Sequence, residues 1–246
     1  MLIIRNILYW IGMISLTFCM VIPFIIGLIL PRRVRHHFGV FWAKGNIRLL
    51  EWTVGLKYQV IGQENMPTEP SIICCKHQSG WETLALQDFF PHQVFVCKKE
   101  LFWIPILGFF LMMMSPIAIN RKKPAEATKQ ILIQGLARKK AGFWISVFPE
   151  GTRIAPGEKG KYKLGAARMA TQLQMNIVPV AVNSGEFWPK NSFLKYPGLI
   201  TISIGPTIDY HIGSNEEIMQ QCENWIEAEQ KKIDGVGPFA KKHQPA

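Results

Sequence analysis

SIICCKHQSGWETLAL, residues 71–86, passes from a strand-like pattern to a helical one across a short polar loop. The apolar run that ends near Lys76 is short and rich in isoleucine, as in a buried strand, and a helical pattern begins near Gly80. His77 lies between the two, at the carboxyl end of the expected strand. Because sites on α/β sheets collect at the carboxyl ends of strands, this stretch predicts both a fold class and the place of a site.

The same alternation continues along the chain from residue 57. Short runs rich in valine and isoleucine predict strands at residues 57–62, 71–76, 94–98, 116–120, 143–148, 176–182 and 199–205. Helical patterns fill the intervals at residues 81–90, 124–140 and 163–174. The alternation predicts an α/β fold with a mixed, largely parallel sheet flanked by helices. We expect one such domain over residues 57–236 and a frayed tail over residues 237–246.

The composition narrows the class of partner. Lysine and arginine outnumber aspartate and glutamate 28 to 17, and the formal charge of +11 favours phospholipid head groups, a phosphorylated substrate or nucleic acid. The apolar content of 48% favours lipid, and the chain shows no nucleic-acid-binding module, so we expect no nucleic-acid partner. The five scattered cysteines have neither zinc spacing nor a disulfide framework, which indicates a reducing compartment.

Residues 7–30 form an uncharged apolar run, longer than the ~20 residues needed to cross a bilayer core. A cleaved signal peptide is the alternative, but the run is long, lacks a small-residue cleavage pattern and ends in a basic segment. Pro23 and Gly27 interrupt it, which allows a kinked span or two short helices within one leaflet. With the aromatic and basic residues at 41–56, the run predicts a membrane-anchoring helical region over residues 1–56.

Basic residues around this run predict its orientation. Arg32, Arg33 and Arg35 follow the run, whereas only Arg5 precedes it. Positive charge stays on the cytoplasmic side of a membrane. We therefore expect the bulk of the chain to face the cytoplasm, on the inner (cytoplasmic) membrane.

A carboxylate, Glu82, follows the loop histidine five positions later. Ser79 and Glu82 have capping-box spacing, in which the glutamate accepts from the Ser79 backbone N–H. The same carboxylate could accept the ring N–H of His77 and fix its tautomer, which leaves the other nitrogen as a base. Both roles stay open. A zinc site or a thiol nucleophile at Cys74 and Cys75 is disfavoured, because adjacent strand residues point to opposite faces and nothing marks an electropositive thiol.

The second polar segment follows the strand expected at residues 143–148, and its members are Glu150, Gly151, Thr152 and Arg153. Gly151 permits positive φ or close backbone approach, and the planar fork of Arg153 suits a phosphate. An ordinary turn with a surface ion pair is the alternative for this segment alone. Two further basic loops, with Lys98 and Arg121, follow other expected strands, and together the three loops predict an anion site.

Taken in order, these segments resemble the motifs of the 1-acylglycerol-3-phosphate acyltransferases of the PlsC type, in the glycerolipid acyltransferase superfamily. The resemblance covers residues 60–205. HQSGWE resembles the His-x-x-x-x-Asp motif, KKEL and INR the second motif, FPEGTR the third and IVPVAV the fourth. Glu82 stands where aspartate is usual, so its reach toward His77 is longer by one methylene.

The resemblance implies an enzyme that moves a fatty acyl group from a thioester, acyl-CoA or acyl-acyl-carrier-protein, to the free hydroxyl of lysophosphatidic acid. The product would be phosphatidic acid for phospholipid biosynthesis, with no cofactor and no metal. His77 would be the general base and Glu82 its partner. The substrate-binding residues would be Lys98, Arg121, Glu150, Gly151, Thr152 and Arg153. Another lysolipid acceptor, or a non-catalytic membrane-anchored lipid-binding protein, are the alternatives.

A second uncharged stretch, residues 101–119, is nearly long enough to span a membrane. A span there would separate HQSGWE from FPEGTR on opposite sides of the bilayer. Proline and glycine break the stretch, so we expect a broken apolar element beneath the site that lines an acyl-chain groove, with a buried core helix as the alternative.

Overall fold

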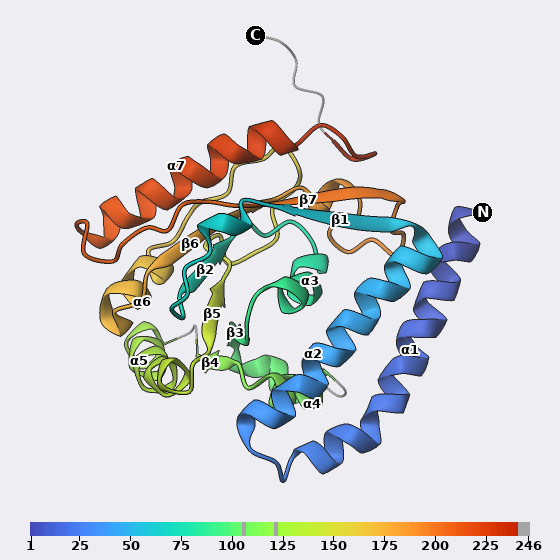
Figure 1. Cartoon of the computed structure of the whole chain (residues 1–246), viewed down its shortest axis with the longest axis horizontal. Coiled ribbons are helices and arrows are strands. Elements are labelled where there is room, and N and C mark those ends of the chain that lie inside the picture. Colours follow the sequence, from blue (N-terminus) through green and yellow to red (C-terminus); the bar gives the residue numbers. More distant parts are fainter. Residues whose placement is uncertain (105–106, 121–122, 241–246) are drawn as a thin grey trace.

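The computed structural model describes residues 1–104, 107–120 and 123–240, which form a seven-stranded sheet between helical layers (Figure 1). The strands are β1 Leu56–Ile61, β2 Ile72–Cys75, β3 Gln93–Lys98, β4 Ile117–Ile119, β5 Trp144–Val147, β6 Ile177–Val182 and β7 Gly198–Ile204. Their order is β1-β7-β6-β2-β5-β3-β4; β6 and β7 pair antiparallel, and every other neighbouring pair is parallel. The predicted mixed, largely parallel sheet is confirmed, and each predicted strand is present.

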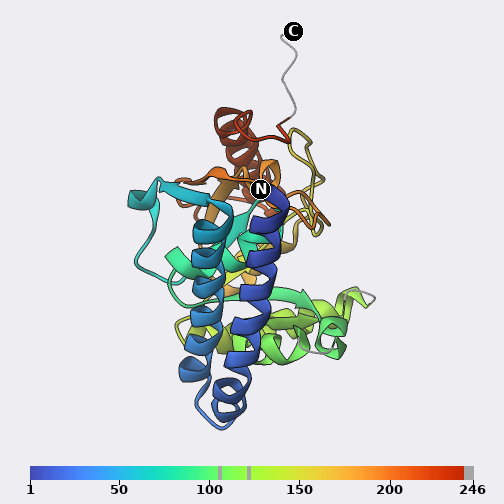
Figure 2. The ribbon, with the colours of Figure 1, turned by 90° about the vertical axis from the view of Figure 1, so that its right-hand side faces the viewer.

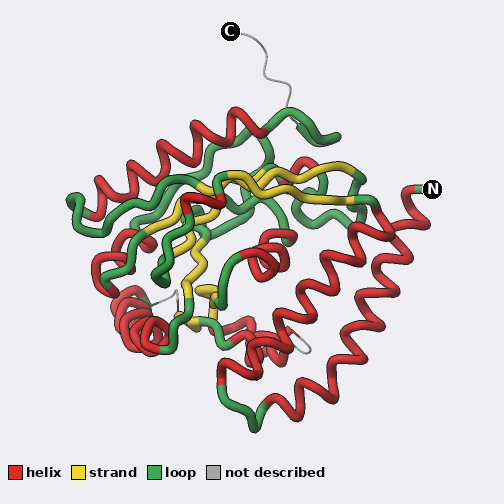
Figure 3. Tube along the Cα trace, viewed as in Figure 1, coloured by secondary structure: helices red, strands yellow, loops and turns green. Residues whose placement is uncertain are grey.

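Helices cover both faces of this sheet (Figure 3). The helices are α1 Leu2–Gly27, α2 Arg32–Leu49, α3 Trp81–Phe89, α4 Leu107–Met114, α5 Pro124–Lys140, α6 Gly165–Leu173 and α7 Asn215–Ile233. One face carries α5, α6 and α7, and the other carries α3 with the pair α1 and α2. The helix α7 was not predicted from the sequence. It begins at a capping box: Ser214 Oγ accepts from the Glu217 backbone N–H, and the Glu217 carboxylate accepts from the Ser214 backbone N–H.

The central strand β2 is buried on both faces. Ile72 and Cys74 pack in the cluster with α6 and α7, whereas Ile73 and Cys75 pack in the cluster with α2 and α3. Successive side chains of a strand point to opposite faces, so a continuous apolar run is what a doubly covered strand requires.

The N-terminal segment is a helical hairpin (Figure 2). α1 continues through Pro23 and ends at Gly27, and α2 begins at Arg32, so the predicted interruption occurs at the glycine and not at the proline. The segment expected to lie along a membrane interface forms the end of α2 and a π-helical turn, Leu50–Val54. Some of its apolar side chains enter the core, among them Ile47, Leu50 and Val54, whereas Phe41 and Trp52 are exposed. Within the described residues, α1 is the one helix whose length and composition would allow it to cross a membrane.

Both ends of α1 contact the α/β domain. Near its start, the Asn6 side chain donates to the Lys195 carbonyl at 2.9 Å and accepts from the Lys195 backbone N–H at 2.7 Å. Near its end, Met20 and Phe24 pack against buried Met113 of α4. α1 therefore lies along the domain over its length, with many large apolar side chains exposed on its other side.

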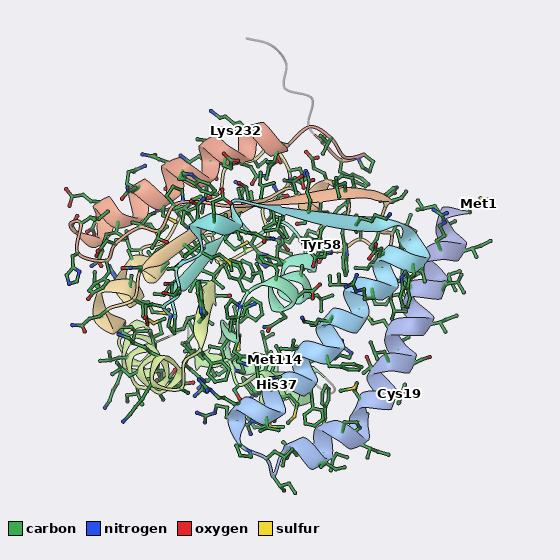
Figure 4. The ribbon with its side chains drawn as sticks, viewed as in Figure 1. Met1, Cys19, His37, Tyr58, Met114 and Lys232 are labelled. Atoms are coloured by element: carbon green, nitrogen blue, oxygen red, sulfur yellow. The ribbon has the colours of Figure 1, made fainter. Side chains whose placement is uncertain are left out.

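The second apolar stretch does not form a spanning helix in the described residues. It contributes a 3-10 turn at Lys99–Trp103, the short helix α4 and the strand β4. Met114 of α4 lies against α2 at Gly39, where a larger side chain would collide with its sulfur (Figure 4). The expectation of a broken apolar element is confirmed. Because β4 pairs with β3 in the same sheet, HQSGWE and FPEGTR lie in one domain.

Candidate active site

The site residues predicted from the sequence follow four neighbouring parallel strands, β2, β5, β3 and β4. The register aligns Cys74 with Val147, so His77 and Glu150 each come three residues beyond an aligned pair. Lys98 is the last residue of β3 and is aligned with Ile119 of β4. Parallel strands end at one edge of a sheet, which brings these loops together.

His77 is held by contacts on both its ring and its backbone. Its imidazole stacks on Phe148, with ring centroids 3.9 Å apart, and Phe148 in turn stacks on Phe95 at 5.8 Å. The His77 carbonyl accepts from the Ile154 backbone N–H at 2.8 Å. The side chain is 16% exposed and Nδ1 is buried, so Nε2 is the ring nitrogen left to act on a substrate.

Glu82 is 1% exposed and its carboxylate binds several donors. Oε1 accepts from the backbone N–H groups of Gln78 and Ser79, both at 2.9 Å, and from the Ser184 hydroxyl at 2.6 Å. Oε2 accepts from Ser79 N–H at 3.0 Å and lies 3.7 Å from His77 Nδ1. The predicted reach of Glu82 back to the Ser79 N–H is confirmed, and the same carboxylate lies beside the imidazole at ion-pair distance.

The start of α3 differs from a complete capping box. The N-cap is Gly80, and the Ser79 hydroxyl accepts from the Trp81 backbone N–H at 3.2 Å. The Glu82 carboxylate is directed into the protein, where it accepts hydrogen bonds from two backbone N–H groups that precede the helix. No sequence pattern indicated Ser184, which follows β6 and lies more than 100 residues along the chain from Glu82.

Glu150 is buried within the loop after β5. Its exposed fraction is 3%, Oε1 accepts from the His77 backbone N–H at 3.5 Å, and Oε2 is buried with no hydrogen-bond partner among the described residues. Burial raises the pKa of Glu150 to about 7, and the charge of Lys76 opposes that rise. The Glu150 carboxyl therefore contacts the His77 loop and is shielded from solvent.

The rest of this loop turns outward. Gly151 has φ of +69°, and its N–H donates to the Phe148 carbonyl at 3.0 Å, which is a tight turn that favours glycine. Thr152 is exposed, and Arg153 Nη2 donates to Asn191 Oδ1 at 3.0 Å. In the described part of the chain Arg153 makes no ion pair with Glu150. The hydrogen bond to Asn191, a residue that no sequence pattern indicated, orients the guanidinium.

Of the two remaining predicted anion-binding residues, the structure describes Lys98. Lys98 is exposed at the end of β3, two strands from β2, which corresponds to about 10 Å of backbone separation. Arg121 lies outside the described residues. The structure therefore brings His77, Glu82 and Glu150 into contact and places Lys98 at the same sheet edge.

The alternatives for the cysteine pair are disfavoured by the geometry. Cys74 and Cys75 are buried on opposite faces of the sheet, and burial raises the pKa of the Cys75 thiol. No group of three histidine, cysteine, aspartate or glutamate side chains is arranged to hold a metal among residues 1–104, 107–120 and 123–240.

A family model described as Acyltransferase matches residues 57–183, which include β2 to β6, β1 except for Leu56, and every predicted site residue. A Pseudomonas aeruginosa protein named 1-acyl-sn-glycerol-3-phosphate acyltransferase is 36% identical over 99% of this chain and 96% of its own length. The chain belongs to the acyltransferase family.

Two further proteins are similar to this chain in sequence or in fold. A Saccharomyces cerevisiae protein of the same name is 32% identical over 55% of this acyltransferase and 46% of its own length. The crystal structure of the 1-acyl-sn-glycerophosphate (LPA) acyltransferase PlsC from Thermotoga maritima has a TM-score of 0.77 and 19% identity, over 94% of this chain and 95% of that one. The latter similarity is one of fold and includes the N-terminal hairpin, because it covers nearly the whole chain.

Proposed function

We propose that this acyltransferase moves a fatty acyl group from a thioester to the free hydroxyl of 1-acyl-glycerol-3-phosphate and so produces phosphatidic acid. The observation that carries the proposal is the imidazole of His77 beside the buried carboxylate of Glu82, at a sheet edge with basic side chains. Similarity over nearly the full length to a protein named for this reaction supports the acceptor.

His77 acts as the general base. An alcohol is a poor nucleophile, so Nε2 removes the hydroxyl proton as the oxygen attacks the thioester carbonyl. Glu82, 3.7 Å from Nδ1, stabilises the imidazolium that forms. The new C–O ester bond replaces the C–S bond, and the imidazolium returns its proton to the leaving thiolate. No covalent acyl-enzyme is needed.

The basic side chains bind the acceptor phosphate. Arg153 offers a planar fork that Asn191 already orients, Lys98 ends β3, and Arg121 follows β4 in the sequence. A phosphate held there positions the glycerol hydroxyl against His77, which converts binding energy into orientation. Gly151 and Thr152 shape the turn beside the phosphate, and Glu150 contacts the glycerol or the histidine loop.

The acyl donor is acyl-CoA or acyl-acyl-carrier-protein, and the reaction needs no cofactor and no metal. The apolar segment around α4 packs beneath α2, where it would line a groove for an acyl chain. Adaptable methionine side chains suit that role.

We assign residues 1–56 to membrane anchoring, residues 57–236 to catalysis and residues 237–246 to a tail. Because both ends of α1 contact the α/β domain, a span through both leaflets would require the hairpin to leave the domain. We therefore favour insertion of the exposed apolar side of α1 into one leaflet. The basic residues after α1 favour the cytoplasmic side of the inner membrane.

The test is turnover by the purified full chain in detergent with labelled lysophosphatidic acid and each donor type. Phosphatidic acid should form, and His77→Ala should abolish its formation. A second set of lysolipid acceptors separates the head-group alternatives. Binding of lysophosphatidic acid without turnover with either donor would contradict the proposal and favour a lipid-binding protein.

A further inference from the structure

Lys76, the residue before His77, is a buried cation. Its side chain is 1% exposed, and its backbone N–H donates to the Val180 carbonyl at 2.9 Å, which continues the pairing of β2 with β6. An ammonium group in the interior is costly unless charged and polar partners surround it. The charge must therefore be matched by groups on the face that covers β2.

Its partner comes from the C-terminal helix. Glu227 of α7 places Oε1 2.6 Å from the Lys76 ammonium, and the same oxygen accepts from the Tyr162 hydroxyl at 2.7 Å. The ammonium also donates to the Glu158 carbonyl at 3.3 Å. Glu227 lies outside residues 57–183, so no part of the matched family segment supplies this carboxylate.

These contacts join the two loops of the site. Tyr162 and Glu158 belong to the segment that follows Arg153, whereas Lys76 leads directly into His77. The same two loops meet where the His77 backbone N–H approaches Glu150 Oε1 and where Ile154 N–H donates to the His77 carbonyl. We call the place where these two loops meet the loop junction. A single carboxylate on α7 thus binds residues on both sides of it.

We infer that Lys76 and Glu227 are positioning residues for acyl transfer: the buried ion pair from α7 holds the His77 loop and the loop after β5 in register. The inference rests on the function proposed above. Neither side chain acts on substrate. Their effect is on the placement of the base relative to the bound acceptor, so the loss should fall on kcat and spare the KM of the acceptor.

The matched control lies one turn earlier on the same helix. Glu223 pairs with Lys159 of the loop after β5 at 2.6 Å, but that lysine is 61% exposed, and within the described residues the pair makes no hydrogen bond to the His77 loop. We expect Glu227→Gln to lower kcat by at least about tenfold with the acceptor KM within about twofold, and Glu223→Gln to leave both within about twofold. Equal effects of the two substitutions would overturn the inference.

The pH dependence provides a readout that general loosening of the fold would not produce. The base His77 faces Glu82 through its ring and Glu150 through its backbone N–H, and around Glu150 lie Lys76, Glu227, Tyr162, Cys74 and Cys75. Lys76→Met removes a positive charge that disfavours protonation of the site, so the acid limb of kcat/KM should move to higher pH. Glu227→Gln removes a negative charge that favours protonation, so the acid limb should move to lower pH. Shifts in the same direction, or none, would overturn the inference.

The double variant Lys76→Met/Glu227→Gln protects the test against misfolding. Replacing both partners removes the unpaired buried charge, so the melting temperature should recover toward that of the parent. We expect kcat to stay low, because the neutral pair no longer fixes the junction. Recovery of both the melting temperature and kcat would overturn positioning.

His77→Ala is assayed alongside these variants. If it retains activity, the proposed reaction at His77 fails. If it is inactive while Glu227→Gln is fully active, only the role of the ion pair fails.

Discussion

Glu82→Gln tests the catalytic carboxylate with the smallest change in shape. The amide keeps the size of the side chain but loses the charge 3.7 Å from His77 Nδ1. It also introduces an NH₂ group where the carboxylate now accepts hydrogen bonds from Gln78, Ser79 and Ser184. The substitution therefore affects the transition state and the fold by separate contacts.

The expected loss in rate follows from the charge. Two unit charges 3.7 Å apart attract by about 4 kcal/mol at an effective dielectric constant of about 20. Loss of this attraction to the imidazolium should raise the barrier by about 3 kcal/mol or more, which lowers kcat by two or more orders of magnitude. Weaker bonds to the backbone donors should lower the free energy of unfolding by about 2 kcal/mol.

The assay is steady-state formation of phosphatidic acid, combined with denaturant unfolding in the same detergent. Ser184→Ala is the control, because it removes one donor to Glu82 Oε1 and leaves the charge in place. We expect its kcat to stay within about tenfold of the parent. Glu82→Asp restores the residue usual in this family and should keep partial or full activity.

A kcat for Glu82→Gln within about tenfold of the parent would refute the reasoning, since the loss of an electrostatic partner of the base should lower the rate by more than that. Glu82 would then be a cap only. A large fall in kcat for Ser184→Ala as well would assign the effect to the shape of the loop and not to the charge.

Three other substitutions test separate contacts. Arg153→Lys should raise the KM of the acceptor, with little change in the KM of the thioester, because the bidentate fork is lost. An effect confined to the KM of the thioester would instead assign Arg153 to donor binding. Glu150→Gln should remove a pH dependence of stability: burial raises the pKa of Glu150 from its ordinary 4.5 to about 7, so its contribution is complete below pH 4.5 and is lost as the pH rises through 7. The parent should lose up to about 3 kcal/mol relative to the variant over that window, measured by denaturant unfolding, and parallel curves would contradict this. Asn6→Ala should leave the buried Lys195 N–H and carbonyl unpaired and lower the free energy of unfolding by about 3 kcal/mol with kcat little changed; an unchanged unfolding midpoint would show that α1 docks without this contact.

The sequence determined the sheet and the edge on which the site lies. Short apolar runs between turn residues specify strands locally, and a continuous run such as residues 72–75 specifies a strand covered on both faces. Because parallel strands end at one edge, the loops with His77 and Glu150 could be placed together from their positions after strands alone.

The tertiary structure decided which groups complete the site. Ser184 on Glu82, Asn191 on Arg153 and Glu227 on Lys76 are contacts between residues far apart in the chain. No periodicity relates such residues, since their meeting depends on how β6, the loop before β7 and α7 pack onto the sheet.

The N-terminal hairpin divides in the same way. Its apolar length could be read from residues 7–30, because hydropathy is a local property. Whether that run crosses a bilayer or lies against the domain could not be predicted from the sequence. The position of α1 depends on the contacts of Asn6 with Lys195 and of Phe24 with Met113. Those contacts join residues far apart in the chain, 189 positions in the case of Asn6 and Lys195, and a local sequence pattern does not specify which distant residues will meet.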